Sequence, residues 1–252
     1  MADKLNKYRL VGFAISVVCA ILFILLCNTI PLEENLARCL VDREPGSDGV
    51  KLFAFQYLMW ILFFWGLSEI LIRFLFVRAQ EQEIELEFLR GNANTLLAAE
   101  QMETLMADIE NSGQGGMLSE ILRPLVQNFQ TNLSTTICND LLNSQIQLRS
   151  NDIDRAYSIL RYIVWMLPTL GFMGTVWGIL HALKVDMESD ALLTIITDRM
   201  SVAFWTTLLA LVLTSIIMYL MQYVQCREET HLNYCHKYCL NKFVNKLYER
   251  QN

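Results

Sequence analysis

Four long runs without a single Asp, Glu, Lys or Arg interrupt an otherwise mixed sequence. They lie between Arg9 and Glu33, Lys51 and Glu69, Arg161 and Lys184, and Arg199 and Arg227. A bilayer core of about 30 Å needs about 20 helical residues at about 1.5 Å each, and each run is of that order. The pattern therefore predicts an all-α membrane protein with four transmembrane helices.

These runs divide the chain into predicted segments. We expect transmembrane helices at 10–30, 52–76, 157–183 and 200–226. Between the second and third of them, apolar residues recur at helical spacing in 77–156, which predicts a helical domain there. The remaining segments are the N-terminus 1–9, two loops at 31–51 and 184–199, and a C-terminal helix at 227–252.

The distribution of basic residues predicts the orientation of the chain. Most of the 20 lysine and arginine residues fall in the two termini and in 77–156, and few fall in the loops 31–51 and 184–199. Basic segments near membrane spans stay in the cytoplasm. We therefore expect both termini and the helical domain to be cytoplasmic, with the two loops on the opposite side.

Composition agrees with this class and excludes several others. Hydrophobic residues make up 54% of the chain and charged residues 18%, against about 45–50% and about 25% in soluble domains. With a net charge of −6 and no basic stripe, the sequence gives no support for nucleic-acid binding. The spans hold no Ser/His or metal-ligand set, so we expect neither an enzyme nor a cofactor.

One cysteine-containing helix face is open to two interpretations. His231, Cys235 and Cys239 recur at four-residue steps in the C-terminal helix. A zinc site of this kind would need a fourth ligand from elsewhere in the chain. We interpret the face as one that packs on a neighbouring helix, and we expect no metal.

A carboxylate and a guanidinium stand near the end of the second predicted span. Glu69 and Arg73 are four residues apart, a spacing that allows an ion pair on one helix face. An intramembrane carboxylate is also typical of proton relays. Because this one lies near the boundary and beside an arginine, we interpret the two as a structural ion pair.

Small and hydroxyl-bearing residues are concentrated in the third and fourth predicted spans. Glycines and alanines allow two helices to approach closely in lipid. The hydroxyls have two open interpretations: bonds to carbonyls of their own helix, or the wall of a narrow ion path. The predicted packing residues are Gly171, Gly174, Gly178, Ala203 and Ala210, and the predicted ion-path residues are Thr175, Thr207, Thr206 and Ser201.

Apart from Arg161 near the start of the third span, these two spans contain no Asp, Glu, Lys or Arg residue. Only His181 can titrate near neutral pH, and it lies near the outer end of the third span. A proton path normally needs an ionisable carrier near the middle of the membrane. If the protein conducts protons, we expect the carrier to come from another chain.

Two segments resemble the MotA/TolQ/ExbB proton-channel family. The sequence P-T-L-G-F-M-G-T-V-W-G-I at Pro168–Ile179 is similar to the family segment P-x-x-G-L-L-G-T-V-W-G-I. The sequence M-S-V-A-F-W-T-T-L-L-A-L at Met200–Leu211 resembles the family's A-L-x-x-T-x-x-G-L segment. By position, Thr175 and Thr207 match the threonines of the two motifs, and Pro168 would set a bend at the entry to the pore.

The resemblance implies an assembly and a mechanism. It implies a bacterial inner-membrane subunit that forms a pentamer around a dimer of single-span partners of the MotB/TolR/ExbD type. The partner's aspartate would carry the proton, and ion flow would drive rotation or force. The alternative is a structural membrane scaffold without ion conduction. Two positions depart from the pattern: Val202 stands where TolQ and ExbB members have a glutamate, and Ala210 replaces a common glycine.

Overall fold

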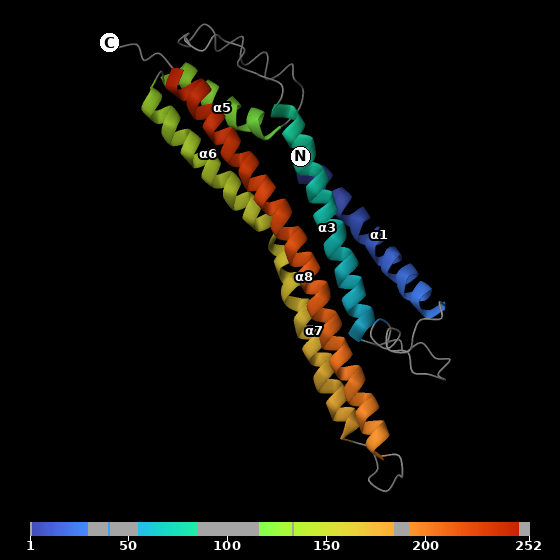
Figure 1. Ribbon diagram of the computed structural model, residues 1–252. Coiled ribbons are helices and arrows are strands. Elements are labelled where there is room, and N and C mark those ends of the chain that lie inside the picture. Colours follow the sequence, from blue (N-terminus) through green and yellow to red (C-terminus); the bar gives the residue numbers. More distant parts are fainter. Residues whose placement is uncertain are drawn as a thin grey trace. The chain divides into compact units, whose positions relative to one another are not determined.

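The structure, a computed structural model, is helical throughout its described residues (Figure 1). It describes residues 2–29, 40, 55–84, 116–132, 134–183 and 192–246. The chain divides into two compact units. The first, here called the span unit, comprises Ala2–Ile72 and Ser158–Gln222. The second, here called the insert unit, comprises Arg73–Tyr157 and Tyr223–Asn252.

The span unit is built from helices that correspond to the charge-free runs. They are α1 (Ala2–Thr29), α3 (Phe55–Ile84) as far as Ile72, α7 (Ser158–Ala182), and α8 (Leu192–Tyr238) as far as Gln222. A helix satisfies its backbone hydrogen bonds internally, which is what an apolar run in lipid requires.

The packing of α1 on α3 depends on a glycine and on aromatic pairs. A Cβ at Gly12 of α1 would lie 2.7 Å from Ile72 Cδ1 and 2.8 Å from Ser68 Oγ, both on α3. Phe13 and Phe23 of α1 contact tryptophans of α3, with ring centroids 5.1 and 4.5 Å apart. The two helices lie side by side in Figure 1. Glycine contact and ring packing thus join them over several turns.

A second glycine lets α3 approach the other long helices of this unit. A Cβ at Gly66 would lie 2.8 Å from Ile217 Cδ1 of α8 and 3.5 Å from Ile163 Cγ2 of α7. Ile163 and Ile217 are fully buried. These three helices therefore share one apolar core inside the span unit.

Within the part of the chain that the structure describes, three helical stretches are long and apolar enough to cross a membrane. They are Phe55–Glu81, Thr135–Ala182 and Ala203–Phe243. The apolar part of α1, Val11–Cys27, is shorter. The protein is therefore a multi-pass membrane protein, while the fourth span and the cytoplasmic placement of 77–156 stay predictions.

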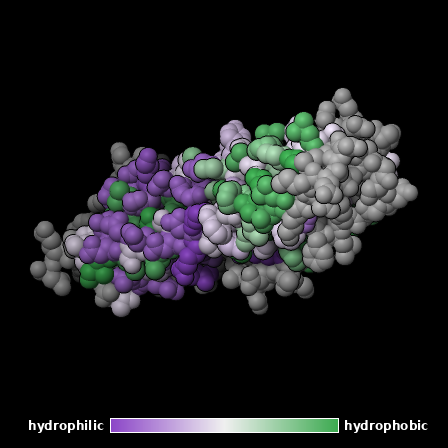
Figure 2. All heavy atoms as spheres, turned by 90° about the horizontal axis from the view of Figure 1, so that it is seen from below, coloured by the Kyte–Doolittle hydropathy of each residue, from purple (hydrophilic) through white to green (hydrophobic). Residues whose placement is uncertain are grey.

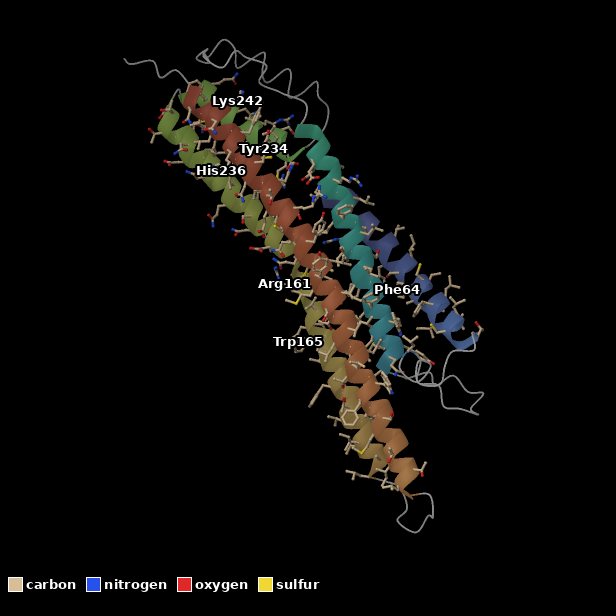
Figure 3. All side chains as sticks on the ribbon, in the orientation of Figure 1. Phe64, Arg161, Trp165, Tyr234, His236 and Lys242 are labelled. Atoms are coloured by element: carbon tan, nitrogen blue, oxygen red, sulfur yellow. The ribbon has the colours of Figure 1, made fainter. Side chains whose placement is uncertain are left out.

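The outward faces of these helices are strongly apolar. On α7, Trp165 is 63% exposed and Phe172 is 67% exposed, and on α8 Phe204 is 60% exposed. Trp165 and Arg161 project from α7 in Figure 3, and Figure 2 shows hydrophobic and hydrophilic residues gathered on separate patches. Contiguous apolar surface of this kind needs lipid or protein to cover it.

The insert unit has its own helices and its own core. Its described helices are α5 (Met117–Asn132), α6 (Thr135–Ala156), the ends of α3 and α8, a π-helical turn η1 (Cys239–Phe243) and a 3₁₀ turn η2 (Val244–Lys246). An ion pair between Glu120 and Arg149 joins α5 to α6. Its fully buried core side chains include Leu122, Leu125, Phe129, Leu142 and Phe243.

Helix α8 differs from the predicted segments at both ends. It begins at Leu192, inside the predicted loop 184–199, and it runs without interruption past residue 226 to Tyr238. Its 47 residues correspond to about 70 Å, more than twice the hydrocarbon core of about 30 Å. The predicted fourth span and the first part of the predicted C-terminal helix are therefore one element. The predictions for the loop 31–51 fall outside the described residues apart from Leu40, and so do those for 85–115.

Candidate functional site

Two glycines bring α7 and α8 into close contact. A Cβ at Gly171 would lie 2.6 Å from the Cβ of Ala210 and 3.2 Å from the Cα of Thr207. A Cβ at Gly174 would lie 2.8 Å from Thr206 Oγ1. Gly171, Gly174, Ala203 and Ala210 are all buried at this contact or along the same helices. Small residues thus allow the two backbones to approach within the span unit.

The close approach joins two threonine hydroxyls. Thr175 Oγ1 of α7 and Thr207 Oγ1 of α8 are in direct hydrogen-bonding contact. Thr175 Oγ1 also lies 3.1 Å from the carbonyl oxygen of Gly171 and 3.3 Å from that of Ala203. Thr207 Oγ1 lies 3.1 Å from the same Gly171 carbonyl. The two helices are therefore linked by hydroxyls and by carbonyls of both backbones.

These contacts outnumber the protons that the two hydroxyls can donate. Each threonine has one O–H donor and two acceptor lone pairs. If Thr207 donates to Gly171, Thr175 can donate to Thr207 or to Ala203, and the reverse arrangement is equally possible. Both side chains are half-buried, so one side of the pair remains open in the single chain. Such a pair can exchange hydrogen bonds with a group brought from outside.

Thr206 and Ser201 take other roles in the structure. The Thr206 hydroxyl is buried and donates to the carbonyl of Ala203 on its own helix, 2.7 Å away. Ser201 is half-buried and, among the described residues, makes no hydrogen bond to Thr175 or Thr207. Thr214 and Ser215 likewise donate to carbonyls of α8. The structure thus brings Thr175 and Thr207 together, while Thr206, Thr214 and Ser215 bond to carbonyls of their own helix.

Pro168 lies inside α7 and not at a helix boundary. Proline has no backbone N–H, so the carbonyl four residues earlier loses its usual donor. Beside it, the Thr169 hydroxyl donates to the carbonyl of Met166, 2.7 Å away. The break between α6 and α7 lies at Tyr157, whose φ is −87° and ψ is 0°. The bend expected at Pro168 stays a prediction.

The ion pair predicted between Glu69 and Arg73 does not form. Glu69 Oε2 lies 3.2 Å from Arg9 Nε on α1. Arg73 Nη1 lies 3.3 Å from Glu228 Oε2 on α8. Each residue therefore has its ion-pair partner on another helix. This corrects the sequence prediction.

The sequence reasoning missed two residues of the insert unit, Tyr157 and Glu228. Both are buried, and the Tyr157 hydroxyl donates to Glu228 Oε2 at 2.9 Å. A seven-residue repeat along α8 was the available signal, because Thr207, Thr214 and Met221 lead to Glu228 on one face. Read in this way, the repeat would have placed Glu228 on a buried helix face.

The described residues contain no cluster of His, Cys, Asp or Glu suited to a metal ion. His231, Cys235 and Cys239 are all buried on α8 and η1. Burial lowers the pKa of the His231 imidazole, opposed by the nearby charge of Glu81. His181, near the other end of the span unit, bonds the carbonyl of Trp177 on its own helix through Nδ1.

Comparison with known proteins finds a family match for the region that carries the threonine pair. A sequence model of the MotA/TolQ/ExbB proton channel family matches residues 113–235, which include α5, α6, α7 and most of α8. No curated protein and no solved structure matches the chain. The family match confirms the resemblance seen in the sequence. Residues 113–235, just under half of the chain, match the MotA/TolQ/ExbB proton channel family.

Proposed function

We propose that this chain is the ring-forming subunit of a proton-driven energy-transducing complex. The family match over residues 113–235 supports a proton-channel role. In the proposed complex the chain forms a homopentamer around a dimer of single-span partners of the MotB/TolR/ExbD type. It spans the bacterial inner membrane four times with both termini in the cytoplasm, and it converts ion flow into torque or force.

The contact between Thr175 and Thr207 carries this proposal. It joins two helices of the matched family region, and its hydroxyls have more acceptors within reach than protons to donate. Because both side chains are half-buried, the pair can present hydroxyl oxygens to a group that approaches from another chain. We infer that this side of the pair lines the ion path.

The carrier of the proton comes from the partner in this proposal. Between Arg161 and Lys184, and between Arg199 and Arg227, the chain has no acidic or basic residue other than His181. A carboxylate on a partner helix supplies the missing titratable group, and the threonines accept hydrogen bonds from it or donate to it as it changes charge. The chain thus contributes a polar wall and the partner contributes the charge.

The test is to remove each hydroxyl without changing the side-chain shape. Thr175→Val and Thr207→Val replace the hydroxyl with a methyl group, and Thr175→Ser and Thr207→Ser keep it as matched controls. The readout is cytoplasmic acidification in cells that co-express the chain with its single-span partner, followed with a pH-sensitive fluorescent protein. Assembly is checked by co-purification of the two proteins.

We expect the valine variants to assemble but to lose proton entry at least tenfold, and the serine variants to keep most of it. Wild-type proton entry in both valine variants would remove the ion-path role of this pair. If no single-span protein co-purifies with the wild-type chain, the proposed assembly itself is wrong.

A second candidate function is a membrane scaffold that packs without conducting ions. It is favoured by the hydroxyls of Thr206, Thr214 and Ser215, which bond to carbonyls of their own helix. A scaffold would tolerate both valine variants but would lose assembly in Gly174→Leu, because a Cβ at this position already meets Thr206. The two proposals therefore predict opposite effects for hydroxyl removal.

A further inference from the structure

A buried cluster in the insert unit joins three parts of the chain. Glu228 of α8 accepts a hydrogen bond from the Tyr157 hydroxyl at 2.9 Å. Arg73 Nη1 of α3 lies 3.3 Å from Glu228 Oε2 and 3.5 Å from Oε1. The Arg73 guanidinium also lies over the Tyr157 ring, 4.7 Å from its centroid. The three side chains therefore contact one another as one group.

The cluster closes the ends of a long segment. Arg73 and Tyr157 are the first and last residues of the segment Arg73–Tyr157, which contributes α5, α6 and the end of α3 to the insert unit. Both contact Glu228, which belongs to the other segment of the same unit. One carboxylate thus holds the entry and the exit of this segment together.

Stability alone does not account for a charged group at this place. The Arg73 and Glu228 side chains are only 7% and 5% exposed. Arg73 Nε has no hydrogen-bond partner among the described residues. Burying two charges costs desolvation free energy that their attraction often fails to offset, and well-packed apolar residues at such sites are often as stable. Buried ion pairs are best attested as devices that select one register among several.

A neighbouring ion pair makes the register more specific. Arg227 donates to Glu81 of α3 through Nη2 at 2.6 Å and through Nε at 3.2 Å, and its guanidinium lies 5.7 Å from the Phe74 ring centroid. Arg227 and Glu228 are adjacent on α8 and opposite in charge. Rotating α8 by one residue would turn Arg227 toward Arg73, which places like charges together in a site away from water.

We propose that Arg73, Tyr157 and Glu228 form a charged clasp that specifies the register of α3 and of the Tyr157 turn against α8. The clasp positions these elements; it does not supply their net stability. This inference goes beyond proton conduction and does not depend on it. An apolar replacement of both charges should therefore keep the fold stable but lose the single register.

Two measurements on the full chain distinguish an effect on the register of α3 and α8 from an effect on the stability of the protein. Spin labels at Arg78 of α3 and Lys237 of α8, both exposed, report the distance between these helices by double electron–electron resonance. The exposed native cysteines Cys19 and Cys226 are replaced by serine, and labelled chains are diluted with unlabelled chains. The thermal midpoint of the detergent-purified protein reports stability.

The test variant is the triple substitution Arg73→Met/Tyr157→Phe/Glu228→Leu, which removes both charges and also the Tyr157 hydroxyl that would otherwise stay buried without an acceptor. We expect a thermal midpoint equal to or above that of the wild type and a distance distribution at least twice as wide or with more than one maximum. The charge swap Arg73→Glu/Glu228→Arg should restore a single narrow distribution. The control Asp152→Asn/Arg155→Gln removes an exposed pair on α6 and should leave the distribution unchanged.

Three outcomes overturn the proposal. An unchanged narrow distribution in the apolar triple variant means that apolar packing sets the register. A large fall in its thermal midpoint means that the cluster is stabilising. Broadening in the Asp152/Arg155 control as well means that the labels report general loosening and not the clasp.

Discussion

At the scale of single residues, the contact between α7 and α8 depends on the absence of a side chain at Gly171. The nearest atoms to an added Cβ are the Ala210 Cβ at 2.6 Å and the Thr207 Cα at 3.2 Å, and neither can rotate away. At Gly174 the nearest atom is the Thr206 hydroxyl oxygen at 2.8 Å, which can rotate. The surroundings of Gly174 therefore tolerate an added side chain better than those of Gly171.

We expect Gly171→Ala to destabilise the protein by about 1–3 kcal/mol, the usual cost of overpacking, and Gly174→Ala to destabilise it less. Ala210→Gly in the Gly171→Ala background removes the closest contact and should recover part of the loss. The measurement is the thermal midpoint of the detergent-purified protein. Equal midpoints for the wild type and both alanine variants would show that the helices are not in close contact here.

The buried cysteines of the insert unit have raised pKa values. Burial raises the pKa of the Cys138 thiol to about 11 and that of the Cys235 thiol to about 12, and it raises the pKa of Cys239 in the same direction. These thiols are therefore protonated at neutral pH, and a protonated thiol is a poor nucleophile. Because the folded form binds the proton more tightly, their contribution to stability is present below the ordinary value of 9.0 and falls as the pH rises above it.

We expect a water-soluble maleimide at neutral pH to label the exposed Cys226 but not Cys138, Cys235 or Cys239. All three buried thiols should react once the protein is unfolded in detergent and urea. Mass spectrometry of peptides identifies the labelled positions, with Cys226→Ser as the control for Cys226. Rapid labelling of Cys239 in the native protein would contradict its burial.

At the scale of helices, two ion pairs hold α3 against different neighbours. Arg9 of α1 pairs with Glu69, and its side chain is 21% exposed. Arg73 pairs with Glu228 of α8, and its side chain is 7% exposed. Removing a carboxylate leaves the guanidinium uncompensated, which is more costly the less water can reach it. The two pairs should therefore respond differently to the same substitution.

We expect Glu228→Gln to destabilise the protein by about 3–5 kcal/mol, as for other broken buried pairs, and Glu69→Gln to cost clearly less. Thermal midpoints of the purified variants give this order. Asp152→Asn, which breaks an exposed pair on α6, is the control and should have almost no effect. A larger loss for Glu69→Gln than for Glu228→Gln would contradict the burial argument.

At the scale of the whole molecule, the chain is a multi-pass membrane protein in which residues 113–235 match a proton-channel family. The family region carries the threonine pair but no acidic residue within α7. The proposed complex therefore needs a second protein to supply the titrating group. In the proposed complex the ion is the proton, and the family match supports this choice.

We expect the activity of the complex to be unchanged when all sodium is replaced by potassium and to disappear when a protonophore removes the proton gradient. The measurement is cytoplasmic acidification in cells that express the chain with its partner. The Thr175→Ser variant serves as the control for a pair that keeps its hydroxyl. Loss of activity without sodium would assign the path to sodium.

Much of the architecture could be predicted from the sequence. Hydropathy predicted the apolar helices because a charge-free run long enough for a bilayer is a local property of the chain. The matching positions of Gly171, Thr175 and Thr207 were predicted from motif and spacing, and the structure places them at one contact. Hydropathy does not show where a helix ends outside an apolar run: α8 continues past residue 226 to Tyr238.

The sequence by itself determined the membrane class, the family and the absence of a titrating group from the third and fourth runs. All three follow from which residues are present and how they are spaced. Only the tertiary structure decided which charges pair, giving Glu69 to Arg9 and Glu228 to Arg73 and Tyr157. The physical reason is that an ion pair depends on which helices meet and on how well water reaches the site. Spacing along one helix determines neither.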